Sequence, residues 1–139
     1  MAAALLVLQL SGLSMHGQSA EAAKVSIWSG LYSIEQAEYG RQEYMDKCSN
    51  CHADNLVGMF PAPPLRGAGF VTRWNGKSVR DIYSRIRSTM PADEPGTLSR
   101  KETFAITAFL FQENGFPAGE NELTGKPKEL QQMMISLEK

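Results

Sequence analysis

Three segments of this chain place small or apolar residues at the three- and four-residue spacing of an α-helix. The first segment runs from Ile34 to about Cys48, and its stripe contains Ala37, Gly40 and Tyr44. A glycine inside a helix costs about 1 kcal/mol relative to alanine. Gly40 therefore predicts that another backbone approaches the first helix closely.

The second helical segment begins with a cap. Ser78 is followed three residues later by Asp81, which makes an acidic variant of the capping box. The apolar residues that follow occupy the i, i+3, i+4 and i+7 positions of one helix face: Val79, Ile82, Tyr83 and Ile86. We expect this face to be buried and the helix to end before Pro91.

The third helical segment has a full capping box, formed by Ser99 and Glu102. The apolar run over residues 104–111 predicts a largely buried helix, and Asn114-Gly115 is a C-terminal stop signal. The three patterns together predict an all-α fold class, with three main helices joined by long loops.

Glycine and proline dominate residues 53–77, between the first two helices. This segment shows no period of 2 or 3.6 residues, so we predict a loop. A loop of this length is unusual in a compact domain unless something organises it, and a bound group would do so. Beyond the third helix, residues 117–139 are first polar and then apolar, which fits either a packed flap or a docking segment for a partner.

The N-terminal segment predicts a secretory signal peptide. An apolar run over residues 2–13 precedes the A-x-A sequence at 20–22, although no basic residue precedes the run. The run is about a dozen residues long, short of the ~20 that a membrane-spanning helix needs, so cleavage after Ala22 is favoured over a membrane anchor. The expected division is a signal peptide (1–22), an N-terminal extension (23–33), a central domain (34–116) and a C-terminal extension (117–139).

The net charge of the chain bears on which partners to expect. The 139 residues hold 14 basic and 15 acidic side chains, and loss of a leader that contains Glu21 leaves 14 of each. A nearly neutral chain gives no reason to expect a nucleic-acid partner.

The sequence C-S-N-C-H at residues 48–52 is the attachment signature of c-type haem. The thiols of Cys48 and Cys51 can each add to one vinyl group of haem as a thioether, and His52 can then bind the iron. A disulfide redox pair is one alternative, but it normally lies in a βαβ unit that this sequence lacks. A zinc site is another, but there is no third cysteine, and the second histidine, His16, lies in the predicted leader.

The iron of a c-type haem commonly takes a methionine thioether on its other face, which favours the ferrous state, so the chain is expected to supply a methionine as well. Met45 and Met59 lie within seven residues of the C-S-N-C-H sequence, so both are tethered to the histidine side. Met90 lies 38 residues after the histidine and can reach the opposite face. Met133 and Met134, in the C-terminal tail, are the competitors.

Three further residues are candidates to face the haem propionates: Arg66, Arg73 and Trp74. Guanidinium groups bind carboxylates, and a buried indole N–H needs an acceptor. The alternatives are that Trp74 is ordinary core and that the arginines are solvated. Tyr83, on the buried face of the second helix, is also predicted to contact the cofactor.

The chain resembles class I cytochromes c over roughly residues 34–116. The resemblance rests on the C-S-N-C-H sequence, on Gly40 and Tyr44 in the helix before it, and on Met90 before a proline after a short helix. It implies one covalently bound haem c, with His52 and Met90 as the axial ligands of the iron. It also implies one-electron transfer in the bacterial periplasm by a protein without catalytic residues of its own.

The resemblance also indicates partners. The sequence N-G-F-P-A-G at residues 114–119 is similar to cytochromes that accept electrons from quinoprotein dehydrogenases, and similar small cytochromes deliver electrons to haem-copper oxidases. Redox proteins of these kinds are expected, and a membrane only if the leader is uncleaved. Two alternatives stay open: a cytochrome subunit held in a dehydrogenase or oxidase complex, and a haem enzyme or gas sensor with an open distal site.

Overall fold

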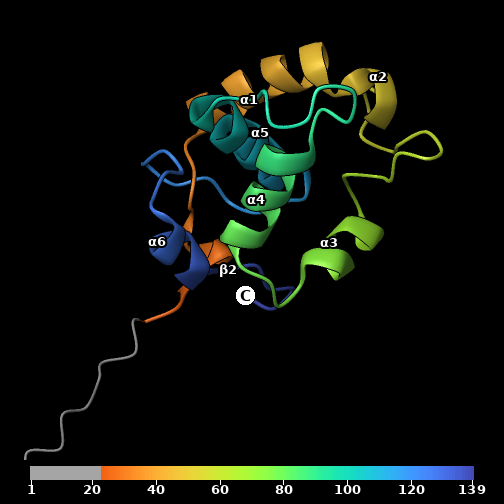
Figure 1. Ribbon diagram of the computed structural model, residues 1–139. Coiled ribbons are helices and arrows are strands. Elements are labelled where there is room, and N and C mark those ends of the chain that lie inside the picture. Colours follow the sequence, from red (N-terminus) through yellow and green to blue (C-terminus); the bar gives the residue numbers. More distant parts are fainter. Residues whose placement is uncertain (1–22) are drawn as a thin grey trace, which may run out of the picture.

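The computed structural model describes residues 23–139, so the predicted leader and its cleavage site lie outside the described residues. Its elements, in chain order, are β1 (Val25–Ser26), the short 3-10 helix η1 (Ile27–Ser29), α1 (Ile34–Lys47), α2 (Ser49–His52), α3 (Ala68–Trp74), α4 (Val79–Thr89), α5 (Arg100–Glu113), α6 (Pro127–Gln132) and β2 (Met133–Met134) (Figure 1). The three predicted helices are α1, α4 and α5, which confirms the all-α fold class. No helix in this part of the chain is long and apolar enough to cross a membrane.

Serine caps fix where the main helices begin. The hydroxyls of Ser78 and Ser99 accept hydrogen bonds from the backbone N–H of Asp81 and Glu102, and both capping boxes are complete. Hydrogen bonds from Ser99, reinforced by the Lys47 ammonium, lower the pKa of Glu102 to about 2. The cap of α5 therefore stays charged throughout the neutral and mildly acidic range.

Helix α3 corrects the prediction that residues 53–77 have no regular structure. It follows Gly67, which has a φ of 82°, and no side chain caps its first turn. It is stabilised by tertiary contact instead, since Phe70 is buried and its ring lies 6.3 Å from that of Trp74. A helix without a local start signal leaves little trace in a sequence pattern.

The crossing of α1 and α5 forms the centre of the fold. A Cβ atom added at Gly40 would lie 1.8 Å from the carbonyl oxygen of Ala105, so the two backbones touch there. This confirms the close approach predicted from the glycine. Further along the crossing, the Tyr44 and Phe109 rings lie 5.3 Å apart, and Lys47 on α1 forms ion pairs with Glu43 and with Glu102 on α5.

Gly40→Ala should lower the free energy of unfolding by about 3 kcal/mol, the upper part of the usual range for overpacking. The gain of about 1 kcal/mol in helix propensity is too small to offset a clash with backbone atoms that cannot rotate away. Urea unfolding followed by circular dichroism measures the difference. Gly69→Ala in α3 is the matched control, because an added Cβ there meets nothing within 4 Å. Equal stability of the two variants would contradict the packing argument.

The C-terminal tail is part of the core. Leu123, Leu130 and Ile135 are buried, and β2 pairs in parallel with β1. The Gln36 side chain exchanges two hydrogen bonds with the backbone of Leu123, at 2.8 and 2.7 Å. Of the two readings of the tail, the structure therefore shows a packed segment that joins the two ends of the described chain.

Candidate haem site

The C-S-N-C-H sequence occupies the junction of α1 and α2. Cys48 is the junction residue, and its carbonyl accepts hydrogen bonds from the backbone N–H of Cys51 and of His52, at 3.2 and 2.9 Å. This turn places two thiols three residues apart on one side of a helix. Neither thiol is in a disulfide; Cys48 is half-buried and Cys51 is exposed. Burial raises the pKa of the Cys48 thiol to about 12, which argues against a reactive redox thiolate.

The imidazole of His52 is oriented by the loop that follows it. The side chain is buried, and its Nδ1 lies 2.9 Å from the carbonyl oxygen of Pro63. Because a carbonyl only accepts hydrogen bonds, Nδ1 carries the proton and Nε2 carries a lone pair. Nε2 has no hydrogen-bond partner within residues 23–139, and no polar side-chain atom described is both sealed from solvent and unpaired. Nε2 therefore faces open space, which is the arrangement a metal ligand requires.

The loop between His52 and α3 is tied to the two central helices. The Tyr44 hydroxyl on α1 donates to the carbonyl of Ala53 at 2.7 Å. The Asn114 side chain, at the end of α5, donates to the carbonyl of Leu65 and accepts from the N–H of Gly67, each at 3.0 Å. The sequence identified Asn114 only as a helix stop; its role as a loop anchor has no local signal. The Pro63 carbonyl, which accepts the hydrogen bond from His52, also has no local signal in the sequence.

Met90 lies at the end of α4 that points toward α2 in Figure 1. It is half-buried against the core, whereas Met45 and Met59 are 39% and 51% exposed. The competing methionines, Met133 and Met134, form β2, and Met134 also bridges to the first residue before α4. An 11-residue helix is about 16 Å long, so Met90 and the tail methionines lie at opposite ends of α4.

A cavity of about 590 Å³ opens between α3 and α4, and we call it the α3–α4 groove; its lining residues are Arg73, Trp74, Lys77, Asp81 and Arg85. The indole N–H of Trp74 has no acceptor among the described residues, whereas that of Trp28 donates to the carbonyl of Ser136 at 3.0 Å. The Arg73 guanidinium likewise has no ion-pair or hydrogen-bond partner within residues 23–139. Unpaired donors around a cavity of this size fit carboxylates such as the haem propionates.

The other two residues predicted to contact the cofactor, Tyr83 and Arg66, have different surroundings. Tyr83 is buried, and its ring stacks on Phe104 with 4.4 Å between centroids. Its hydroxyl forms no hydrogen bond to any described residue, so it is available to a bound group. Arg66 is not with Arg73: it forms an ion pair with Glu113 at 3.5 Å.

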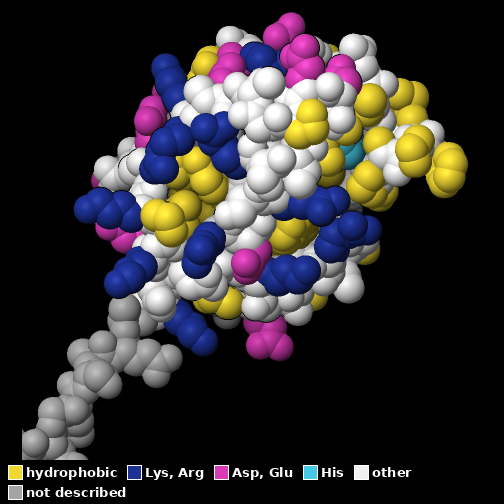
Figure 2. All heavy atoms as spheres, viewed as in Figure 1, with side chains coloured by type: hydrophobic (Ala, Val, Ile, Leu, Met, Phe, Trp, Pro, Cys, Tyr) yellow, Lys and Arg dark blue, Asp and Glu magenta, His cyan; other side chains and the backbone are white. Residues whose placement is uncertain are grey.

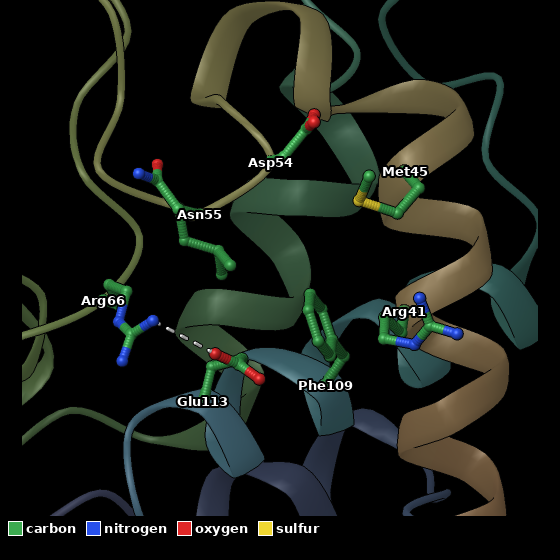
Figure 3. Close-up of a pocket in the computed structure, with 8 residues that line it drawn as sticks. Arg41, Met45, Asp54, Asn55, Arg66, Phe109 and Glu113 are labelled. Atoms are coloured by element: carbon green, nitrogen blue, oxygen red, sulfur yellow. Dashed lines mark ion pairs between the residues drawn. The ribbon is translucent and has the colours of Figure 1, made fainter.

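The Arg66–Glu113 pair borders a second cavity, of about 280 Å³, between α1, α5 and the loop after α2 (Figure 3). Phe109 and Met45 line it from the two helices, with Arg41 nearby. It holds neither a thiol nor the imidazole, and both of its arginines already pair with carboxylates. It therefore does not fit the predicted cofactor.

The residues at the α1–α2 junction fit haem c. They supply two thiols on one side of a helical turn and an imidazole whose Nε2 is open. The zinc alternative gains no support, since no group of three His, Cys, Asp or Glu side chains in residues 23–139 could hold a metal ion.

Comparison with known proteins agrees with this assignment. A solved structure, that of the sulfane dehydrogenase SoxCD from Paracoccus pantotrophus, superposes with a TM-score of 0.50 at 23% sequence identity, covering 94% of this chain and 68% of that one, which shows a shared fold. A search of curated proteins finds no match. The model of the family described as cytochrome c oxidase, cbb3-type, subunit III matches residues 35–110, more than half of the chain. The chain therefore belongs to this cytochrome c family, and the recognised part is a c-type cytochrome domain.

Proposed function

We propose that this protein carries single electrons on one haem c, bound through Cys48 and Cys51, with His52 and Met90 as axial ligands. The observation that carries the proposal is the His52 imidazole, whose Nδ1 is held by the Pro63 carbonyl at 2.9 Å while Nε2 is open beside two unbridged thiols. When bound, the haem supplies a reversible one-electron couple.

The chain's own residues supply orientation and a stable ligand set. The hydrogen bond from His52 to Pro63 fixes the plane of the ring and makes Nε2 a better donor to a metal. A thioether from Met90 would complete the set and favour the reduced state. Met90 is half-buried against the hydrophobic core, which supports its assignment as a ligand over the more exposed Met45 and Met59.

The α3–α4 groove is proposed to receive the haem propionates. Arg73 would pair with one carboxylate and the Trp74 indole N–H would donate to one, which satisfies a donor that has no partner in the described chain. The Tyr83 hydroxyl, which has no hydrogen-bond partner among the described residues, would be a further donor toward the cofactor.

Partners and location are part of the same proposal. SoxCD is a sulfane dehydrogenase, and a cytochrome of this kind would exchange electrons with a dehydrogenase on one side and an oxidase on the other. A periplasmic location follows from the predicted leader, and the mature protein should begin near Ala23 when its N-terminus is sequenced.

Acid–acetone extraction and a redox titration test the proposal. The haem should stay with the polypeptide during extraction, and the protein should cycle reversibly between two spectra with one electron per chain. Pigment that extracts freely, or a spectrum that responds to carbon monoxide in the untreated protein, would contradict a closed, covalent electron-transfer site.

A further inference from the structure

The backbone immediately after His52 is strained. Ala53 has a φ of 63° and a ψ of 154°, a combination that is almost confined to glycine, because a Cβ atom crowds the backbone there. Leu56 has a φ of 62°, and these are the two non-glycine residues with positive φ within residues 23–139. Both lie in the loop that carries Pro63 back to the His52 ring. Strain of this kind persists only where surrounding contacts hold it, so the loop must be clamped.

The Tyr44 hydroxyl supplies the clamp. It donates to the Ala53 carbonyl oxygen at 2.7 Å, and the backbone N–H of Leu56 donates to the same oxygen at 3.1 Å. Tyr44 is itself immobilised, because its side chain is fully buried and its ring lies 5.3 Å from that of Phe109, at the crossing of α1 and α5. The centre of the fold therefore fixes the direction of the Ala53 carbonyl.

A single peptide bond connects the strained residue to the haem ligand. Rotation of Ala53 to a negative φ would relieve the strain, but it would also tilt the peptide plane that follows His52. The His52 carbonyl accepts from the N–H of Gly58 at 2.9 Å, and its Nδ1 is bonded to the Pro63 carbonyl. The residue is only 8% exposed, and the histidine shows in Figure 2 as a small area among hydrophobic side chains. Bonds within the protein therefore set the direction of the ring.

We propose that Tyr44 is a positioning residue for the axial ligand: its hydroxyl holds Ala53 in a strained conformation, and that conformation aims the His52 imidazole. The inference rests on the proposed function and adds a residue to its ligand support. The aromatic ring alone is enough for the packing of α1 on α5. The hydroxyl is needed only for the loop, so the two roles of Tyr44 can be separated by removing one oxygen atom.

Tyr44→Phe removes the hydroxyl and keeps the ring against Phe109. In the haem-loaded protein, the proton on Nδ1 of His52 should exchange with deuterated solvent about fivefold faster or more, the factor that corresponds to the net contribution of one hydrogen bond. Proton NMR measures the exchange rate.

Tyr32→Phe is the matched control. Tyr32 is also buried, and its hydroxyl also donates to a backbone carbonyl, that of Phe116 at 2.6 Å, which lies outside the loop after His52. This variant loses the same kind of bond, and exchange at His52 should change less than about twofold, because opening of that loop is a local event.

Ala53→Gly supplies a rescue. Glycine adopts the observed conformation without the Cβ crowding, so the loop no longer depends on the hydroxyl to hold it. When Ala53→Gly is already present, adding Tyr44→Phe should speed exchange less than about twofold. The two substitutions are therefore coupled, which a purely structural role of the Tyr44 ring would not produce.

Three outcomes would overturn the positioning role: unchanged exchange in Tyr44→Phe, equal acceleration in Tyr44→Phe and Tyr32→Phe, or an undiminished effect of Tyr44→Phe in the presence of Ala53→Gly. Acid–acetone extraction of each sample records covalent haem. Haem that leaves the wild-type chain contradicts the proposed function, whereas any of the three outcomes in haem-loaded protein contradicts the role of Tyr44 alone.

Discussion

Replacing both Cys48 and Cys51 with alanine should abolish the covalent bond between chain and haem, so that essentially all pigment separates during acid–acetone extraction. The two thiols are the only cysteines of the sequence and both are unbridged, so no other residue can form a thioether. Each single variant keeps one thiol and should retain haem at a lower yield. The fraction of haem absorbance left with the polypeptide measures the effect.

Asn50→Ala is the matched control for the cysteine variants. Asn50 lies in the same helical turn, is exposed, and its side chain forms no hydrogen bond within the described chain. Its replacement should leave haem attachment unchanged. Loss of haem in this variant would mean that any disturbance of the turn prevents maturation. Loss of haem in the cysteine variants would then no longer identify the thiols as the attachment points. Haem that resists extraction after both cysteines are removed would also contradict the assignment.

Where the sequence carried a local signal, the fold could be predicted closely. Ser78 and Ser99 cap their helices by contacts three residues away, and such contacts are visible as short sequence patterns. The close crossing of α1 and α5 was indicated by a single residue, because a glycine inside a helix costs about 1 kcal/mol and a close backbone approach accounts for its presence.

Other features that depend on tertiary contact have no local signal and could not be predicted. Helix α3 has no cap and rests on the burial of Phe70. The packing of the tail depends on pairing of β2 with β1, more than a hundred residues apart. The support of His52 by a backbone carbonyl is also invisible, because every residue has one and only the folded loop selects that of Pro63.

The sequence identified candidate side chains by their chemistry, but only the structure shows which of them are already paired with other groups. Arg66 and Arg73 were equivalent candidates, yet one is paired with Glu113 and the other lines the groove. The two tryptophans differ in the same way: the indole N–H of Trp28 already has an acceptor and that of Trp74 does not. Which donors are left unpaired is a property of the whole fold.

Met90→Ala should lower the reduction potential by about 0.1 V or more, a modest part of the ~0.8 V range over which axial ligands tune haem. The thioether favours reduced iron, and its loss removes that preference. The variant should also lose the weak far-red charge-transfer band that iron–thioether bonding produces, and it should bind carbon monoxide and cyanide. A redox titration and the absorption spectrum measure these effects.

Met133→Ala and Met134→Ala are the controls, because both residues lie in β2, at the other end of α4 from Met90. Each substitution should weaken the packing of β2 against β1 but leave the far-red band and the reduction potential nearly unchanged. If the band survives Met90→Ala and disappears in a tail variant, the ligand is in β2 and the chain must rearrange around its cofactor. If the wild-type protein lacks the band and binds carbon monoxide rapidly, the distal face is open, and the site is that of a haem enzyme or gas sensor. Spectra of the wild type and these variants therefore distinguish an electron carrier with Met90 as ligand from a protein with its ligand in β2 and from a haem enzyme or gas sensor with an open distal face.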